Sequence, residues 1–167
     1  DSSAVTAVTN LVSNVGVVAT DVTGVGTARR YMTATEYGTN KDKGIFGFGE
    51  GSYYGMTNLV TNVGVVGTDV TAVGTARYGP AACGYGTDTA IFAYGYTGSQ
   101  VSMSNLVSNA GVVATDTTGV GTARSSLGAT QYGTTKGIFG FGTPGPTAVT
   151  NLVSNVGVIG TEVTGVG

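Results

Sequence analysis

The stretch TNLVSNVGVV, residues 9–18, decides the fold because near-copies of it occur four times along the chain. The copies begin at residues 9, 57, 104 and 150, so they are spaced 48, 47 and 46 residues apart. Each copy leads into a second block, TDVTGVGTAR at 20–29, and then towards a third, KGIFGFG at 43–49. Such a period indicates one supersecondary unit used repeatedly. We therefore expect one repeat domain over 1–167, with units 9–56, 57–103 and 104–149 and a partial unit 150–167.

The composition within each unit is that of short strands. Val, Thr, Ile, Phe and Tyr lie between glycines, and large and small residues alternate in IFGFG at 45–49. We predict four strands per unit, near 28–35, 44–49, 9–13 (57–61 in the next unit) and 16–21. The Asn-Val-Gly at 14–16 predicts a hairpin turn between the last two, because Asn and Gly tolerate positive φ.

The order of these blocks resembles kelch-type β-propeller repeats. Arg29, Arg77 and Arg124 match the recurring arginine of that family, and Gly49, Gly95 and Gly142 stand where it has a glycine pair. The resemblance implies an all-β fold in which each blade, of about 50 residues, is a four-stranded antiparallel sheet that radiates from a central channel. The near-identical Gly/Thr/Val units are also similar to repeat regions in tail-associated virion proteins of bacteriophages.

The number of units conflicts with a closed ring, because propellers have four to eight blades and this chain holds three units and a part of one. An open arc leaves apolar faces and strand edges exposed. Three interpretations remain: a fragment of a longer protein, copies that assemble to close the ring, or units that stack as a filament. Self-association, or contact with other virion proteins, is therefore the expected kind of partnership.

Composition excludes several classes of function. The chain has no histidine, so a Ser-His-Asp triad, a Cys-His dyad and a histidine-ligated zinc site are impossible. Seven Lys and Arg against nine Asp and Glu give no basic excess for nucleic acid. The apolar runs are too short for membrane insertion, and the lone Cys83 cannot form an internal disulfide. We expect no enzyme, no catalytic residues and no cofactor.

An acid precedes each Gly-Val-Gly block and an arginine follows it. Carboxylates at a repeat spacing could bind Ca²⁺, but each block supplies one acid where calcium loops supply several. The favoured interpretation is no metal site, with each acid capping a turn or pairing with an arginine as a blade-to-blade bracket. The bracket residues are Asp21, Arg29, Asp69, Arg77, Asp116 and Arg124.

Tyrosines mark the candidate ligand surface. Tyrosine stacks on sugar rings and carries a hydroxyl, and variable loops on a repeated scaffold are where binding specificity resides. The connection between the second and third strands varies most between units, and it predicts Tyr53, Tyr54, Tyr94 and Tyr96 as loop ligands for a surface glycan. Packing is the alternative role for the same rings.

Two functions follow as hypotheses. The first is a non-enzymatic structural module of a virion, a phage tail or fibre component built from kelch-like blades. The alternative is a carbohydrate- or receptor-binding propeller. Both would locate the chain in a virion or at an extracellular surface, and they differ in whether the loop tyrosines contact a ligand.

Overall fold

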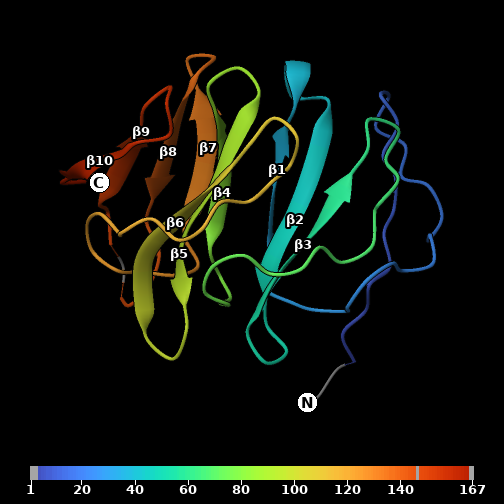
Figure 1. The fold of residues 1–167 in the computed structure, drawn as a ribbon, viewed down its shortest axis with the longest axis horizontal. Helices are drawn as coiled ribbons and strands as arrows, with labels where there is room; N and C mark the ends of the chain where they lie inside the picture. The colour runs from blue at the N-terminus through green and yellow to red at the C-terminus, as the bar shows by residue number, and fades with distance from the viewer. Residues whose placement is uncertain (1–3, 146, 166–167) are drawn as a thin grey trace.

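A computed structural model describes residues 4–145 and 147–165 and shows an all-β protein of three antiparallel sheets (Figure 1). The first sheet contains β1 (Thr33–Tyr37), β2 (Lys43–Gly49) and β3 (Tyr54–Val60). The second contains β4 (Ala81–Tyr85), β5 (Thr89–Tyr96) and β6 (Gln100–Val107). The third contains β7 (Gly128–Tyr132), β8 (Lys136–Gly140), β9 (Thr150–Val153) and β10 (Ile159–Val163). One short 3₁₀ turn, η1 (Thr39–Lys41), joins β1 to β2.

The strands of each sheet follow one another by hairpins, as the alternating sequence requires. In the first sheet Thr35 pairs with Ile45, and Ile45 pairs with Leu59 on its other side. The second and third sheets repeat this register, with Ile91 and Ile138 in the place of Ile45. The predicted Asn-x-Gly turns are present, and their glycines have φ between 78° and 81°.

The fourth strand predicted for every unit is complete only in the third sheet, as β10. In the first sheet it is reduced to two isolated bridges, Thr57 with Val70 and Val60 with Val66, and the second sheet has the corresponding pair of bridges. The first strand also begins later than predicted, at residue 33 instead of 28. Residues 28–32 form an entry segment, because Arg29 is drawn into the interior.

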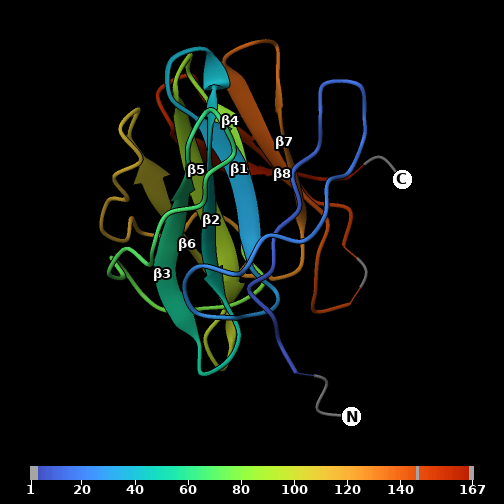
Figure 2. The ribbon, with the colours of Figure 1, turned by 90° about the vertical axis from the view of Figure 1, so that its right-hand side faces the viewer.

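The three sheets lie beside one another in chain order (Figures 1 and 2). Their first strands, β1, β4 and β7, are the neighbours at the contact between sheets. Backbone bonds tie the turns after these strands together: the Gly38 amide donates to the Asp88 carbonyl (2.7 Å), and the Gly86 amide donates to the Thr135 carbonyl (2.8 Å). Within the described residues the sheets form an open series and do not close on one another.

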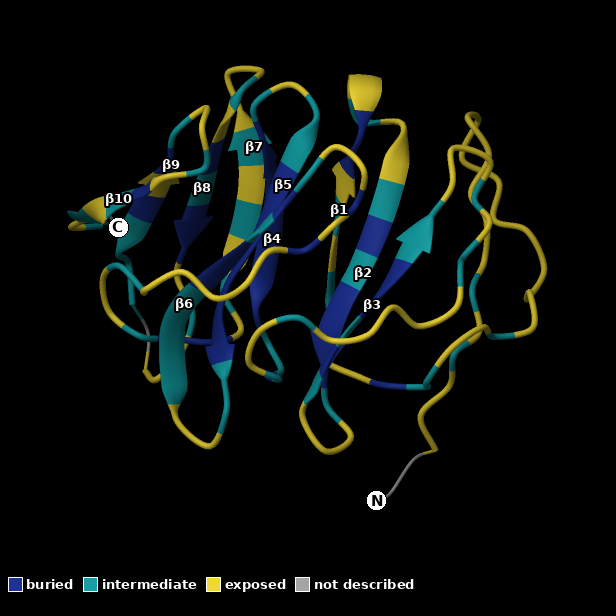
Figure 3. Ribbon diagram, in the orientation of Figure 1, coloured by how far each residue is buried: buried dark blue, intermediate teal, exposed yellow. Residues whose placement is uncertain are grey.

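Two apolar clusters fill the spaces between sheets. One contains Ile45, Phe48 and Phe92 and joins the first sheet to the second; the other contains Ile91, Tyr94 and Phe139 and joins the second to the third. Burial is most complete in the second sheet, where all five residues of β4 and six of the eight residues of β5 are buried (Figure 3). No helix among the described residues is long and apolar enough to cross a membrane.

The first copy of the repeat forms a lone two-stranded unit, the N-terminal hairpin (residues 9–22). It is held by bridges between Thr9 and Val22 and between Val12 and Val18. The hairpin lies against the first sheet, with Leu11 beside the Gly64 turn. Nearly all of it is exposed (Figure 3).

Candidate functional site

Each sheet contains a buried arginine that ties its strands together, and Arg77 shows the pattern. Its Nε donates to the Tyr94 carbonyl of β5 (2.7 Å) and its Nη2 donates to Asn105 Oδ1 of β6 (2.6 Å). Its Nη1 donates to the Thr75 carbonyl (3.1 Å) and lies 3.9 Å from an Asp116 carboxylate oxygen. One guanidinium therefore links the entry segment to β5, to β6 and to the segment after β6 that carries Asp116.

The same arrangement recurs around Arg29 and Arg124. Arg29 pairs with Asp69 at 3.8 Å and with Asn58, and Arg124 pairs with Glu162 at 3.4 Å and with Asn151. We call each arginine with its acid an arginine bracket. The asparagine of the repeated TNLV motif is thus the bracket's third member, a role that residue pattern alone did not reveal.

The brackets keep their charges inside the protein although burial opposes ionisation. Burial lowers the pKa of Arg77 to about 10, which leaves it charged at neutral pH. Burial would raise the pKa of Asp116, but hydrogen bonds from Thr75 and Asn105 and the charge of Arg77 outweigh it and lower the pKa overall. The carboxylate accepts from both the amide and the hydroxyl of Thr75, at 2.9 and 2.7 Å. Charge-assisted bonds of this kind are the strong ones in proteins.

The geometry corrects the expected blade-to-blade bracket in two ways. Each ion pair lies within one sheet, and Asp21 pairs with no arginine: it accepts a hydrogen bond from Asn10 Nδ2 (2.8 Å) in the N-terminal hairpin. The link between sheets is aromatic. The Arg77 guanidinium lies 4.0 Å from the ring centroid of Phe48 in the preceding sheet, and Arg124 lies 4.1 Å from that of Tyr94.

The residue directly after each bracket arginine differs in every sheet. It forms a bridge to the residue after the Phe-Gly or Tyr-Gly of the second strand, and we call these two residues the cross-strand pair. The pair is ionic in the first sheet (Arg30 and Glu50), aromatic in the second (Tyr78 and Tyr96) and hydroxylic in the third. The hydroxylic pair is Ser125 and Thr143. Chemistry thus changes at this position while the neighbouring bracket stays constant.

Four tyrosines gather around the aromatic pair, and we call them the tyrosine cluster: Tyr31, Tyr53, Tyr78 and Tyr96. The Tyr53 ring stacks on Tyr78 with centroids 5.7 Å apart and planes 2° from parallel. Tyr78 also contacts Tyr96 (5.2 Å) and Tyr31 (5.8 Å). The cluster brings together the entry segments and the β2–β3 hairpin, which lies at the lower edge of Figure 1. Tyr31 and Tyr53 are 59% and 40% exposed, so the cluster forms a surface platform.

The two exposed tyrosines are held in an uncommon backbone conformation. Tyr31 has φ 52° and Tyr53 has φ 60°, which bulky residues rarely adopt. The position of Tyr31 is filled by Gly79 in the second sheet, where the same conformation costs nothing. The buried Phe48 and Tyr94 share this conformation, so it is the exposure of the stacked rings that makes the cluster the strongest candidate site in the described chain.

The hydroxyl of Tyr78, at the centre of the cluster, stays protonated. Partial burial, together with Tyr96 and Glu50, raises the pKa of Tyr78 above its ordinary value. Arg30 lies 5.4 Å from the ring centroid of Tyr31 and forms an ion pair with Glu50. The platform therefore offers apolar ring faces, neutral hydroxyls and one ion pair at its rim.

The other predicted ligand tyrosines lie elsewhere. Tyr94 lies inside β5 with no exposed surface, so its prediction as a loop ligand was wrong: it is the ring beneath Arg124, and its hydroxyl donates to the Val120 carbonyl (3.2 Å). Tyr54 is half-buried at the start of β3 and folds over Gly51. Tyr53 and Tyr96 do belong to the cluster. Tyr31 and Tyr78 belong to the cluster but were not among the four predicted ligand tyrosines, although the variation after a constant arginine was a readable signal.

The remaining reactive group is buried. Burial raises the pKa of the Cys83 thiol to about 12, so it stays protonated and is a poor nucleophile. In the described parts of the chain, no three acidic or cysteine side chains gather as a metal site would require.

Comparison with known proteins gives a likeness of fold. No protein-family model and no curated protein sequence matches the chain. Among solved structures, that of YjhT is similar, with a TM-score of 0.54 and 15% sequence identity over 76% of this chain. The match covers 42% of YjhT, so the chain corresponds to less than half of that protein.

Proposed function

We propose that this chain is a non-enzymatic repeat scaffold that binds carbohydrate through the tyrosine cluster. The observation that carries the proposal is a contrast between two neighbouring positions. The bracket arginine is the same in all three sheets, whereas the residue after it varies, and in the second sheet that residue, Tyr78, contacts three other tyrosines. Sugar rings present flat faces of C–H groups that stack on tyrosine, with hydroxyls around them that pair with phenol oxygens. A neutral pyranoside oligosaccharide fits this platform, because its hydroxyls need no charged partner.

The scaffold itself we propose to be part of a kelch-like β-propeller. Support comes from the series of three antiparallel sheets that lie beside one another in chain order, and from the bracket arginines at the family's recurring position. A propeller places the hairpins of neighbouring blades together at one rim, as the tyrosine cluster requires. The hypothesis of a phage tail or fibre module remains a prediction, and mass spectrometry of purified particles tests it.

The experiment for carbohydrate binding compares a double variant, Tyr31→Ala with Tyr53→Ala, with the unaltered chain on a glycan array. Both side chains are largely exposed, so the fold should persist. Tyr132→Ala is the matched control, since Tyr132 is 39% exposed but lies at the end of β7 in the third sheet, outside the cluster. The chain has no tryptophan, so tyrosine emission can be followed when a glycan hit is titrated, and the platform supplies four of the nine tyrosines.

The expected result is binding that survives Tyr132→Ala and is lost in the double variant, with quenched tyrosine emission in the unaltered chain. Glycan hits that persist in the double variant, or the absence of any hit for the unaltered chain, would overturn the proposal.

A further inference from the structure

The contact between the first and second sheets and the contact between the second and third sheets are built from the same set of interactions. An aromatic residue at the end of the second strand, Phe48 or Tyr94, is fully buried beneath the arginine of the next sheet. It also meets the edge of a phenylalanine in that sheet, with centroids 5.2 Å apart for Phe48 and Phe92. The following glycine amide donates to the carbonyl of the arginine, from Gly49 to Arg77 at 3.0 Å. The contact between the second and third sheets repeats these features.

The third sheet presents the same elements without a partner. Phe141 occupies the position of Phe48 and Tyr94 but is 63% exposed. Leu152 is 44% exposed, whereas its counterparts Leu59 and Leu106 pack against the glycine turn of the next sheet. We call this surface, Phe141 with Leu152, the open face.

A buried nitrogen of Arg124 in the third sheet also lacks a partner. Arg124 Nε has no hydrogen-bond acceptor, although the equivalent nitrogens of Arg29 and Arg77 donate to the carbonyls of Phe48 and Tyr94 at 2.7 Å. The acceptor in this pattern would be the Phe141 carbonyl. A buried donor without a partner costs about 1–3 kcal/mol. Settling the Phe141 segment against a neighbouring sheet would give that donor its acceptor.

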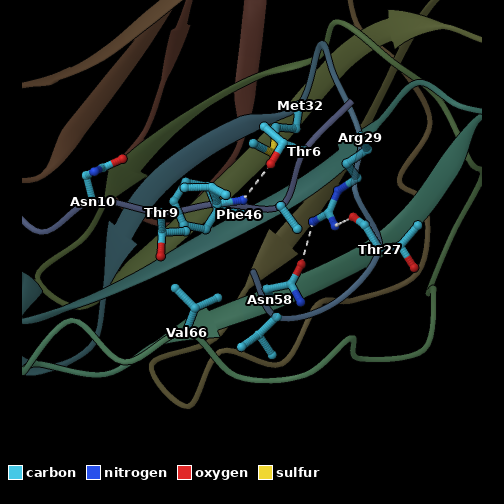
Figure 4. A pocket seen from close by; sticks show the side chains of 12 residues that line it. Thr6, Thr9, Asn10, Thr27, Arg29, Met32, Phe46, Asn58 and Val66 are labelled. Carbon is cyan, nitrogen blue, oxygen red and sulfur yellow. Dashed lines mark hydrogen bonds between the residues drawn. The ribbon is translucent and has the colours of Figure 1, made fainter. Parts of the chain in front are cut away.

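The first sheet presents the complementary half of the contact. Arg29 and Phe46 occupy the positions of Arg77 and Phe92, but no aromatic ring lies between them. A cavity of about 220 Å³ takes its place, lined by Arg29, Phe46, Met32 and Asn58 and closed by residues 6–10 (Figure 4). A cavity of about 150 Å³ already accepts a benzene ring, so this space is large enough for a phenylalanine side chain.

The N-terminal hairpin covers this surface with only half of a sheet. Its Leu11 occupies the place beside the Gly64 turn that Leu59 and Leu106 occupy at the internal contacts. It supplies no second strand and hence no ring beneath Arg29, and it is exposed over nearly its whole length. A complete sheet at the same place would fill the cavity and bury more apolar surface, so it would compete effectively with the hairpin.

From these two halves we infer that the open face of one copy docks on the first sheet of a second copy, with the N-terminal hairpin displaced. Phe141 enters beneath Arg29 and against Phe46, the Gly142 amide donates to the Arg29 carbonyl, and Leu152 packs on the Gly64 turn. The contact is heterologous, so repeated docking builds a ring or an open filament according to the rotation at each step. The inference is independent of carbohydrate binding.

Sedimentation velocity over a range of concentrations tests the docking with two variants of opposite expected sign. Phe141→Ala removes the inserted ring and should weaken association by about tenfold or more. Leu11→Ala loosens the competing hairpin and should strengthen association. Val156→Ala is the control, because Val156 is 67% exposed on a turn and takes no part in the contact.

If the chains associated only through non-specific apolar contacts, all three substitutions would weaken association alike, because each removes exposed apolar surface. That result would overturn the inference, as would an unaltered chain that sediments as a monomer at every concentration. Circular dichroism of each variant verifies that the sheets are intact.

Discussion

Arg77 and Tyr78 are neighbours in the chain, yet they belong to two regions under opposite demands. Arg77 is fully buried, and like Arg29 and Arg124 it bonds to the asparagine of its own sheet and pairs with an acid. Tyr78 belongs to the cross-strand pair of the second sheet. This pair is ionic in the first sheet, aromatic in the second and hydroxylic in the third. The bracket specifies how a sheet is built, and the next position is free to specify what the surface contacts.

The difference teaches how a near-identical repeat can carry a distinct site. A buried arginine has several partners to satisfy, so a change there leaves unpaired groups in the interior. A cross-strand pair at the surface needs only two residues that tolerate each other. The tyrosine cluster arises where this freedom coincides with the hairpin that carries Tyr53.

The largest effect should come from the bracket. Arg77→Ala removes the counter-charge of Asp116 and leaves Asn105 Oδ1 and the Tyr94 carbonyl without their donor, and we expect a loss of about 3–5 kcal/mol in the free energy of unfolding. Arg77→Lys should fail to restore most of it, because an ammonium cannot reach these partners together. Urea denaturation followed by circular dichroism measures both variants.

Arg29→Ala sharpens the comparison, since Arg29 has the same hydrogen bonds but no ring beneath it. It should cost less than Arg77→Ala by about 0.5–2 kcal/mol, the range for a cation–π contact from exposed to desolvated sites. Equal losses for the two variants would mean that the Phe48 contact contributes nothing.

A smaller effect is expected at the glycine that ends the second strand. Gly95 has φ 120°, and a Cβ there would lie 3.0 Å from Arg77 Cδ and 3.1 Å from the Tyr78 carbonyl oxygen. Gly95→Ala should therefore lower the free energy of unfolding by about 1–3 kcal/mol. The control is Gly67→Ala, because alanine stands at the corresponding positions, Ala19 and Ala114, and unfolding midpoints compare the two. If Gly95→Ala left the free energy of unfolding unchanged, the inference that the backbone at residue 95 requires glycine would be wrong.

The acid of the bracket should make stability depend on pH. The pKa of Asp116 is lowered in the folded protein, so its contribution is fully present above the ordinary value near 4 and is lost as pH falls through the lowered pKa. Asp116→Asn should cost about 1–2 kcal/mol at pH 7. The difference from the unaltered chain should shrink as the pH falls below 4.

Thermal unfolding from pH 7 to pH 2.5 measures this difference. Asp21→Asn is the matched control, because Asp21 has an asparagine partner but no arginine. If both variants lost equal stability at pH 7, the arginine would have no part in the effect.

Much of the fold was readable from sequence because the repeat fixes it several times over. The alternation around Ile45 and the Asn-x-Gly turns predicted the strands and hairpins, and the structure confirms an all-β protein of antiparallel sheets. The fourth strand was overpredicted in two sheets, since outer strands have few neighbours to hold their ladders. Its composition alone could not reveal that weakness.

The site was only partly readable. Tyr53 and Tyr96 were predicted from variable positions, but Tyr94 was assigned to the same loop because sequence spacing does not show where a strand ends. The burial of Tyr94 depends on Arg124, which is 30 residues away in sequence and belongs to the next sheet. Contacts between sheets follow from stacking, and one unit read by itself does not contain them.

The smallest effect should come from the ionic cross-strand pair. Arg30 and Glu50 form an ion pair at the surface, where solvent screens the attraction and ordering two side chains costs entropy. Glu50→Gln should therefore shift the melting temperature by less than about 2 °C, and added salt should not enlarge the shift. Differential scanning calorimetry at two salt concentrations measures it. A shift as large as that of Arg77→Ala would erase the distinction between bracket and pair, because the position after the arginine would then be structural and its variation between sheets would need another cause.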